Sequence, residues 1–122
     1  MADHYELTCE PPGIVVLRVY GMLEPEAART LMHELHGYLD QTPDGVGLLL
    51  DVRQAESMSM AVREYVFAQM MHMRKLMAYA VLCLPRTKPS LDEIMAQAAG
   101  MARRMQKFND EAAARAWLIE QL

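Results

Sequence analysis

Apolar residues gather along the chain in short runs that are typical of strands. Three of these runs are apolar at nearly every position, a pattern that predicts strands buried on both faces. A weaker alternation over residues 4–9 predicts a short first strand, which a Pro-Pro-Gly turn at 11–13 would join to the next strand as a hairpin. The buried strands are expected at 14–20, 46–52 and 78–84, and a short edge strand at 106–109.

Other segments carry apolar residues at helical spacing. The first helix has a proline at its first position and the apolar stripe Ala28, Leu31, Met32, Leu35 and Leu39. The third begins with a capping box, Ser90-Leu91-Asp92-Glu93. In the last helix we expect Ala113, Trp117 and Leu118 to face inward. The expected helices are Pro25–Gln41, Met58–Leu76, one that begins at Ser90, and one from Asp110 to Leu122.

The order of these elements is β-β-α-β-α-β-α-(β)-α, which predicts an α/β fold. Strands joined through helices pair in parallel with right-handed crossovers, and the first hairpin adds an antiparallel edge. We therefore expect a mixed sheet of four or five strands with four helices. A chain of 122 residues and 13.9 kDa fits one domain, over 1–122.

Composition and net charge exclude several classes of protein. Hydrophobic residues make up 52% and charged residues 23%, which excludes an intrinsically disordered chain. The net charge of −4 argues against generic nucleic-acid binding. The sequence has neither an apolar run long enough to span a membrane nor a secretory signal at its start, so we expect a cytoplasmic protein. Cys9 and Cys83 are interpreted as small buried apolar residues rather than as a disulfide.

Several local features together resemble a known family. They are the strand Ile14–Tyr20, the turn into Glu24–Ala28, the strand end Leu48–Asp51, the strand Ala80–Pro85, and a closing pattern of Phe108, Ala114, Trp117 and Leu118. The chain resembles the STAS-type fold of anti-sigma-factor antagonists and, more closely, the bacterial SpoIIAA-like family of small STAS-related proteins. The resemblance covers nearly the whole chain and implies a fold, but it implies no catalytic residues.

The resemblance also directs attention to the start of the second predicted helix. Anti-sigma-factor antagonists are switched by phosphorylation of a serine that lies there, in an Asp-Ser-Ser or Asp-Ser-Gly context. This chain has Glu56-Ser57-Met58-Ser59-Met60 instead, so the motif is absent. Ser57 and Ser59 are candidates for phosphorylation, since a helix N-terminus favours a phosphate, or for simple capping of the helix.

The second predicted helix also has an unusual outer face. When Val62 is placed toward the core, a second group of apolar residues falls on the opposite side of the helix. A second apolar stripe bordered by charge is typical of a contact surface, and methionine adapts to varied partners. Three interpretations stay open: an interface with a second copy or another protein, contact with an apolar ligand or membrane surface, and coverage by a neighbouring loop. The predicted interface consists of Met60, Phe67 and Met71 with Arg63 and Arg74 at its border.

The ends of the central strands could hold a ligand, because open α/β sheets bind ligands at the carboxyl ends of their strands. Asp51 and Arg53 follow one strand, and Arg86 and Lys88 follow the next, which suggests an anion site. Asp51 could equally pin its own loop, and the sequence has no glycine-rich phosphate loop. His33 and His36 lack a clear third metal ligand, so we expect neither a metal nor a cofactor.

These observations favour a non-enzymatic protein. No G-x-S-x-G motif is present, and the paired carboxylates lie at predicted helix starts, where the helix dipole explains them. The leading hypothesis is a STAS-like interaction and regulatory module that forms a homodimer or binds a protein partner. The alternatives are a small carrier or sensor of an apolar or lipid-like ligand, by analogy with the layered CRAL-TRIO fold, and a serine-phosphorylated switch of the anti-sigma-antagonist type.

Overall fold

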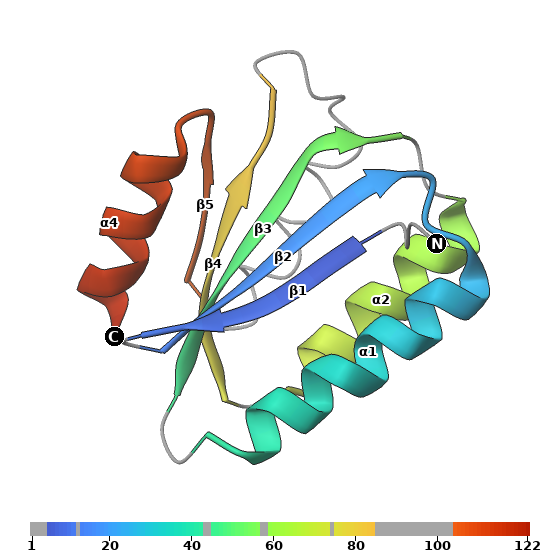
Figure 1. Ribbon diagram of the computed structural model, residues 1–122, viewed down its shortest axis with the longest axis horizontal. Helices are drawn as coiled ribbons and strands as arrows, with labels where there is room; N and C mark the ends of the chain where they lie inside the picture. The colour runs from blue at the N-terminus through green and yellow to red at the C-terminus, as the bar shows by residue number, and fades with distance from the viewer. Residues whose placement is uncertain (1–4, 12, 43–44, 57–58, 74, 85–103) are drawn as a thin grey trace.

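Five strands form one mixed sheet in the order β1-β2-β3-β4-β5 (Figure 1). The structure is a computed structural model that describes residues 5–11, 13–42, 45–56, 59–73, 75–84 and 104–122; of residues 67, 71, 104 and 105 it describes only the backbone. The strands are β1 (Tyr5–Glu10), β2 (Ile14–Gly21), β3 (Val46–Ala55), β4 (Leu76–Leu82) and β5 (Arg104–Phe108). The helices of the described part are α1 (Pro25–Asp40), α2 (Met60–Met71) and α4 (Glu111–Gln121).

Strands β1 and β2 pair antiparallel, and β3, β4 and β5 continue the sheet in parallel with β2. The predicted α/β class with an N-terminal hairpin is therefore confirmed. Gly13 closes the hairpin with a φ of +137°, and its amide donates a hydrogen bond to the carbonyl of Glu10 at 3.1 Å. Helices α1 and α2 lie side by side on one face of the sheet, and α4 covers part of the other face (Figure 1). The predicted helix that begins at Ser90 lies outside the described residues.

The strands differ from the predicted ones by one residue at β1 and β2 and by two or three residues at an end of β3, β4 and β5. Strand β3 continues to Ala55 because the register shifts beyond Arg18, and the end of β2 then pairs with Gln54 and Ala55. Strand β4 begins two residues early, at Leu76, because this residue pairs with Val46 at the start of β3. Strand β5 occupies 104–108 rather than 106–109.

Helix α1 matches its predicted pattern. All five residues of the expected apolar stripe are buried, which confirms the helical spacing as a core-facing pattern. Pro25 begins the helix, where its missing amide hydrogen has no intrahelical partner to lose. The helix ends at Asp40, one residue before the predicted end.

Helix α2 is shorter at both ends than the predicted Met58–Leu76. It begins at Met60 because the hydroxyl of Ser59 accepts a hydrogen bond from the amide of Val62 at 3.2 Å and caps the helix. It ends at Met71 because the chain turns into β4, and the ammonium of Lys75 donates to the carbonyls of Leu39 and Thr42. Apolar residues of the turn and of the following strand, including Leu76, continue the helical spacing, so the predicted helix is too long.

The prediction places the last helix correctly in the chain, but it turns the wrong alanine toward the core. Asp110 caps α4 by accepting a hydrogen bond from the amide of Ala113 at 3.0 Å. Ala114 and Leu118 are fully buried against the sheet, whereas Ala113 is exposed, so its predicted inward orientation is wrong by one position. Trp117 is half-buried and packs on Phe108 with ring centroids 5.7 Å apart.

The sheet separates two apolar cores. The larger lies between the sheet and helices α1 and α2, and the smaller lies under α4. Both cysteines are free: Cys83 is buried as predicted, but Cys9 is exposed on the edge strand β1.

Candidate functional site

The sheet face under α4 carries charged residues next to the smaller core. They lie where β2, β3 and β4 pair with one another. Arg18 on β2 pairs with Asp51 on β3, which pairs in turn with Leu82 on β4. The Nη1 of Arg18 donates to the Asp51 carboxylate at 2.7 Å, although Asp51 is only 6% exposed. A buried carboxylate needs such a partner, because an unpaired charge would be strongly destabilising.

Asp51 is also held by its neighbour on the same strand. Arg53 donates to it from the backbone amide at 3.1 Å and from the side chain at 3.0 Å through both Nε and Nη2. Burial would raise the pKa of the Asp51 carboxyl, but the hydrogen bonds from Arg53 and Arg18 outweigh burial and hold its pKa below the ordinary value. Asp51 therefore fixes the conformation of the last part of β3.

The first turn of α4 joins this arrangement through Glu111. Its carboxylate accepts two hydrogen bonds from Arg18, one from Arg115 at 2.9 Å and a longer one from Arg53 at 3.4 Å. Arg115 reaches back to β1, where it donates two hydrogen bonds to Glu10. These six residues, here called the ionic cluster, bring together three arginines and three carboxylates: Glu10, Arg18, Asp51, Arg53, Glu111 and Arg115.

Two of the four residues predicted for the strand-end site, Asp51 and Arg53, belong to the ionic cluster. Asp51 and Arg53 bind each other rather than presenting an open arginine, and the other two predicted members, Arg86 and Lys88, lie outside the described residues. Sequence reasoning missed their partners Arg18 and Glu111, and also Arg115 and Glu10, which extend the cluster from Glu111 to β1. The available signals were an arginine inside an apolar strand and the four-residue spacing of Glu111 and Arg115.

The start of α2 lies near the carboxyl edge of the sheet. The amide of Glu56, just beyond β3, donates to the carbonyl of Gly21 at 2.7 Å, which places the end of β3 beside the end of β2. Two methionines that follow these strands are exposed: Met22 by 45% and Met60, the first residue of α2, by 67%. Large apolar side chains that remain accessible at one edge can contact a partner.

The structure describes only some of the other residues predicted at this surface. Arg63 is half-buried, and its Nε is buried without a hydrogen-bond partner among the described residues. Ser59 is exposed and caps α2. Ser57, Arg74 and the side chains of Phe67 and Met71 lie outside the structure's description.

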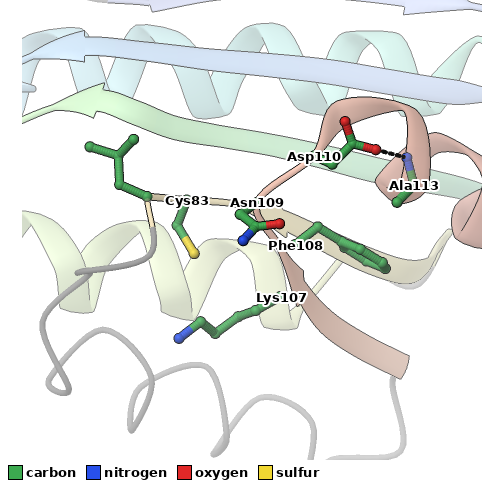
Figure 2. Close-up of a pocket in the computed structure, with 7 residues that line it drawn as sticks. Cys83, Lys107, Phe108, Asn109, Asp110 and Ala113 are labelled. Atoms are coloured by element: carbon green, nitrogen blue, oxygen red, sulfur yellow. Dashed lines mark hydrogen bonds between the residues drawn. The ribbon is translucent and has the colours of Figure 1, made fainter.

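A pocket of about 300 Å³ lies farther along the same edge, where β4 and β5 end and α4 begins (Figure 2). Phe108 closes β5, and its carbonyl accepts a hydrogen bond from the amide of Cys83 at 2.9 Å. Cys83, which is buried, also borders the pocket. Its lining residues are Cys83, Leu84, Lys107, Phe108, Asn109, Asp110 and Ala113.

The described residues contain no group of three metal-ligating side chains, and none of their helices is both long and apolar enough to cross a membrane. With these geometries established, comparison with known proteins gives the family. The family model described as SpoIIAA-like matches residues 14–119. The chain belongs to the SpoIIAA-like family.

Solved structures agree with this assignment at the level of the fold. An uncharacterised protein with a SpoIIAA-like fold from Shewanella loihica is 15% identical, with a TM-score of 0.69 and coverage of 93% of this chain and 91% of that one. An anti-sigma factor antagonist from Mycobacterium paratuberculosis is 13% identical, with a TM-score of 0.66 and coverage of 98% and 97%. The phosphorylated form of the Bacillus cell fate determinant SpoIIAA is 17% identical, with a TM-score of 0.62 and coverage of 93% and 98%. The comparison with curated proteins found no match.

Within this SpoIIAA-like chain, the polar and apolar features lie at different parts of the fold. The ionic cluster joins α4 to strands β1, β2 and β3. The exposed methionines follow β2 and β3, on the way into α1 and α2. The exposed residues at the start of α2 are thus separate from the ion pairs that hold α4.

Proposed function

We propose that this SpoIIAA-like protein is a non-enzymatic regulatory module that binds another protein through the start and outer face of α2. The observation that carries the proposal is the 67% exposure of Met60 at the first position of that helix. The exposed Met22 follows the neighbouring strand end, so an apolar contact can extend beyond one side chain.

The packing of α2 supports this surface. Only Val62 among its described residues is fully buried, whereas α1 buries five residues in the core. Tyr65, Val66 and Met70 pack partly against the same core and complete the inner side of α2. The helical spacing of the sequence puts Phe67 and Met71 away from Val62, and we propose that they extend the contact that Met60 begins.

The polar groups support binding rather than catalysis. A carboxylate that acts as a general acid or base must be able to exchange a proton near neutral pH. The pKa values of Asp51, Glu10 and Glu111 are instead held below their ordinary values by arginine partners, and each of these carboxylates already accepts hydrogen bonds. These residues are suited to holding the fold together.

A second copy of the chain is the first partner to test, because it is present in every preparation. Native mass spectrometry of the wild type should show a dimer, and Met60→Glu should shift it to the monomer because a charge would have to be buried. Ile119→Glu is the matched control, since Ile119 is also an exposed apolar helix residue but lies on α4. A dimer that survives Met60→Glu would contradict the proposed surface, and a monomeric wild type would exclude self-association.

The exposed hydroxyl of Ser59 supports a second candidate function, a phosphorylation switch at the same surface. Phosphate there would lie at the positive end of α2, and Arg63 follows one helical turn later. Ser59→Asp keeps a capping carboxylate and adds negative charge, whereas Ser59→Asn caps without the charge. If the switch operates, only the aspartate variant changes self-association; equal behaviour of both variants would contradict it.

A further inference from the structure

Strand β1 forms an edge of the sheet, and in the described part of the chain only β2 pairs with it (Figure 1). An edge strand is a template for another extended chain unless lysine, proline or a bulge interrupts it. The six residues of β1 include neither lysine nor proline, and they pair with β2 without a register shift. The opposite edge strand, β5, contains Arg104 and Lys107, which are residues that discourage edge pairing. The edge of β1 therefore lacks the common safeguards.

The hairpin turn shows which backbone groups of β1 point outward. The carbonyl of Glu10 accepts a hydrogen bond from the amide of Gly13, so the backbone groups of Glu10 point toward β2. Along an antiparallel strand, the N–H and C=O of one residue point to the same side, and this side alternates from residue to residue. The backbone groups of Leu7 and Cys9 therefore point away from β2, where an added strand can pair with them.

The side chains of β1 differ between its two faces. Tyr5 and Leu7 are half-buried and pack against the larger core, and the exposed Cys9 continues their row. On the other face Glu6 and Thr8 are exposed, whereas Glu10 belongs to the ionic cluster. A strand added at this edge would cover the apolar row on one face and would meet the carboxylate of Glu6 on the other.

We propose that β1 pairs antiparallel with β1 of a second copy, with Leu7 opposite Leu7 on the two-fold axis. This register places Tyr5 opposite Cys9 and Glu6 opposite Thr8, and it pairs the outward backbone groups of Leu7 and Cys9. Such a two-fold contact is self-complementary, so one edge serves both copies.

Other two-fold registers are less favourable. Centring the contact on Thr8 places Glu6 opposite Glu10, and centring it on Glu6 places that carboxylate opposite itself, and like charges directly opposite each other are destabilising. Centring it on Cys9 pairs only residues 8–10 of the described strand. The charge pattern of β1 thus favours the register centred on Leu7.

The contact is small, because a standard protein interface uses roughly 20–30 residues from each partner. We therefore expect β1 to associate weakly, at protein concentrations well above those used for native mass spectrometry. The proposal does not depend on the function proposed for α2, because the two surfaces share no residue. If both contacts form, β1 joins the α2-linked dimers into larger assemblies at high concentration.

The test is sedimentation equilibrium of the full chain carrying Met60→Glu, which removes the contact proposed for α2. We expect reversible dimer formation between about 20 μM and about 1 mM protein, as for a small interface. Over the same range, the backbone amides of Leu7 and Cys9 should gain protection from hydrogen exchange, which assigns the dimer to β1 rather than to α2. A monomer throughout this range, or protection located elsewhere, would overturn the proposal.

Charge variants at the exposed Thr8 test the register. Thr8→Lys would face Glu6 of the second copy and should tighten self-association by at least about threefold, whereas Thr8→Glu should weaken it by at least about threefold. Thr30→Lys and Thr30→Glu make the same charge changes at an exposed position of α1 and should leave self-association unchanged. If both Thr8 variants shift the dissociation constant in the same direction, or neither shifts it, pairing centred on Leu7 is overturned.

Discussion

The carboxylate of Glu111, in the first turn of α4, accepts hydrogen bonds from both terminal nitrogens of Arg18 on β2, at 3.0 and 3.1 Å. The two residues are 93 positions apart in the sequence, so this contact fixes the C-terminal helix to the N-terminal hairpin. Two parallel hydrogen bonds between a guanidinium and a carboxylate define an orientation as well as a distance. Helix α4 is thus attached by the buried Ala114 and Leu118 and, at its first turn, by charge.

Glu111→Gln should destabilise the fold by about 1–3 kcal/mol, because three arginines lose a charged acceptor while the shape of the side chain is kept. Chemical denaturation at pH 7 measures the loss. Glu120→Gln, at an exposed position of the same helix, is the control and should change stability by less than about 0.5 kcal/mol. Equal stability of the two variants would mean that the contact contributes nothing measurable.

The pH dependence of stability follows from the same carboxylates. Arg115 lowers the pKa of Glu10, and Arg18 and then Arg115 lower the pKa of Glu111. Burial alone would raise the pKa of Asp51, but the hydrogen bonds from Arg53 and Arg18 lower it by more. The unfolded chain, with ordinary values of 3.8 for Asp and 4.5 for Glu, therefore binds more protons in acid than the folded chain does. These carboxylates therefore contribute fully to the free energy of unfolding above about pH 5, and their contribution is lost as the pH falls through 4 and below.

Urea midpoints at pH 7, 5, 4 and 3 test this expectation. The wild type should lose stability mainly between pH 5 and 3, and Glu111→Gln should show a smaller loss over that interval because one contributing carboxylate is gone. Parallel curves for the two proteins would show that Glu111 ionises alike in the folded and unfolded states.

The sequence pattern predicts the sheet and α1 well, because the central strands are continuous apolar runs buried on both faces and α1 carries its apolar residues at helical spacing on one face. It fails at the ends of α2. Apolar residues that belong to the turn and to β4, such as Met73 and Leu76, continue the helical spacing by chance. The one-position error in α4 has a similar cause, since a run of alanines does not distinguish Ala113 from Ala114.

The candidate site is less accessible to sequence reasoning, because it depends on pairing between distant elements. Asp51 stands out at the end of an apolar strand, but its partner Arg18 becomes visible only once the register of β2 and β3 is known. The reach of Glu111 across the sheet depends on which face α4 covers. The pocket beside β5 depends on three elements at once, and no motif marks it.

Ser59→Ala should lower stability by about 1 kcal/mol, because the amide of Val62 loses its capping acceptor. Ser59→Asp and Ser59→Asn both supply a capping oxygen and should stay close to the wild type in thermal denaturation. An alanine variant as stable as the asparagine variant would show that the hydroxyl does not stabilise the start of α2.

Gly47→Ala should destabilise the protein by about 1–3 kcal/mol through close packing of α4 on β3. A Cβ at Gly47 would lie 2.9 Å from the Cδ2 of Leu118 and 3.6 Å from its Cβ. Leu118 is fully buried, so its side chain has little room to move away. Alanine would otherwise favour this strand position over glycine, so a loss of stability can be assigned to the contact with Leu118.

A double-mutant cycle with Leu118→Val tests that assignment. Leu118→Val alone should cost about 0.5–1.5 kcal/mol because it leaves a small cavity under α4. In the double variant the new methyl group at position 47 can occupy this space, so the combined loss should be smaller than the sum of the two single losses by at least about 0.5 kcal/mol. Gly37→Ala, on α1, is the control for added volume, since a Cβ there meets nothing within 4 Å. Additive losses would mean that the cost of Gly47→Ala arises in the strand itself and not where α4 rests on it.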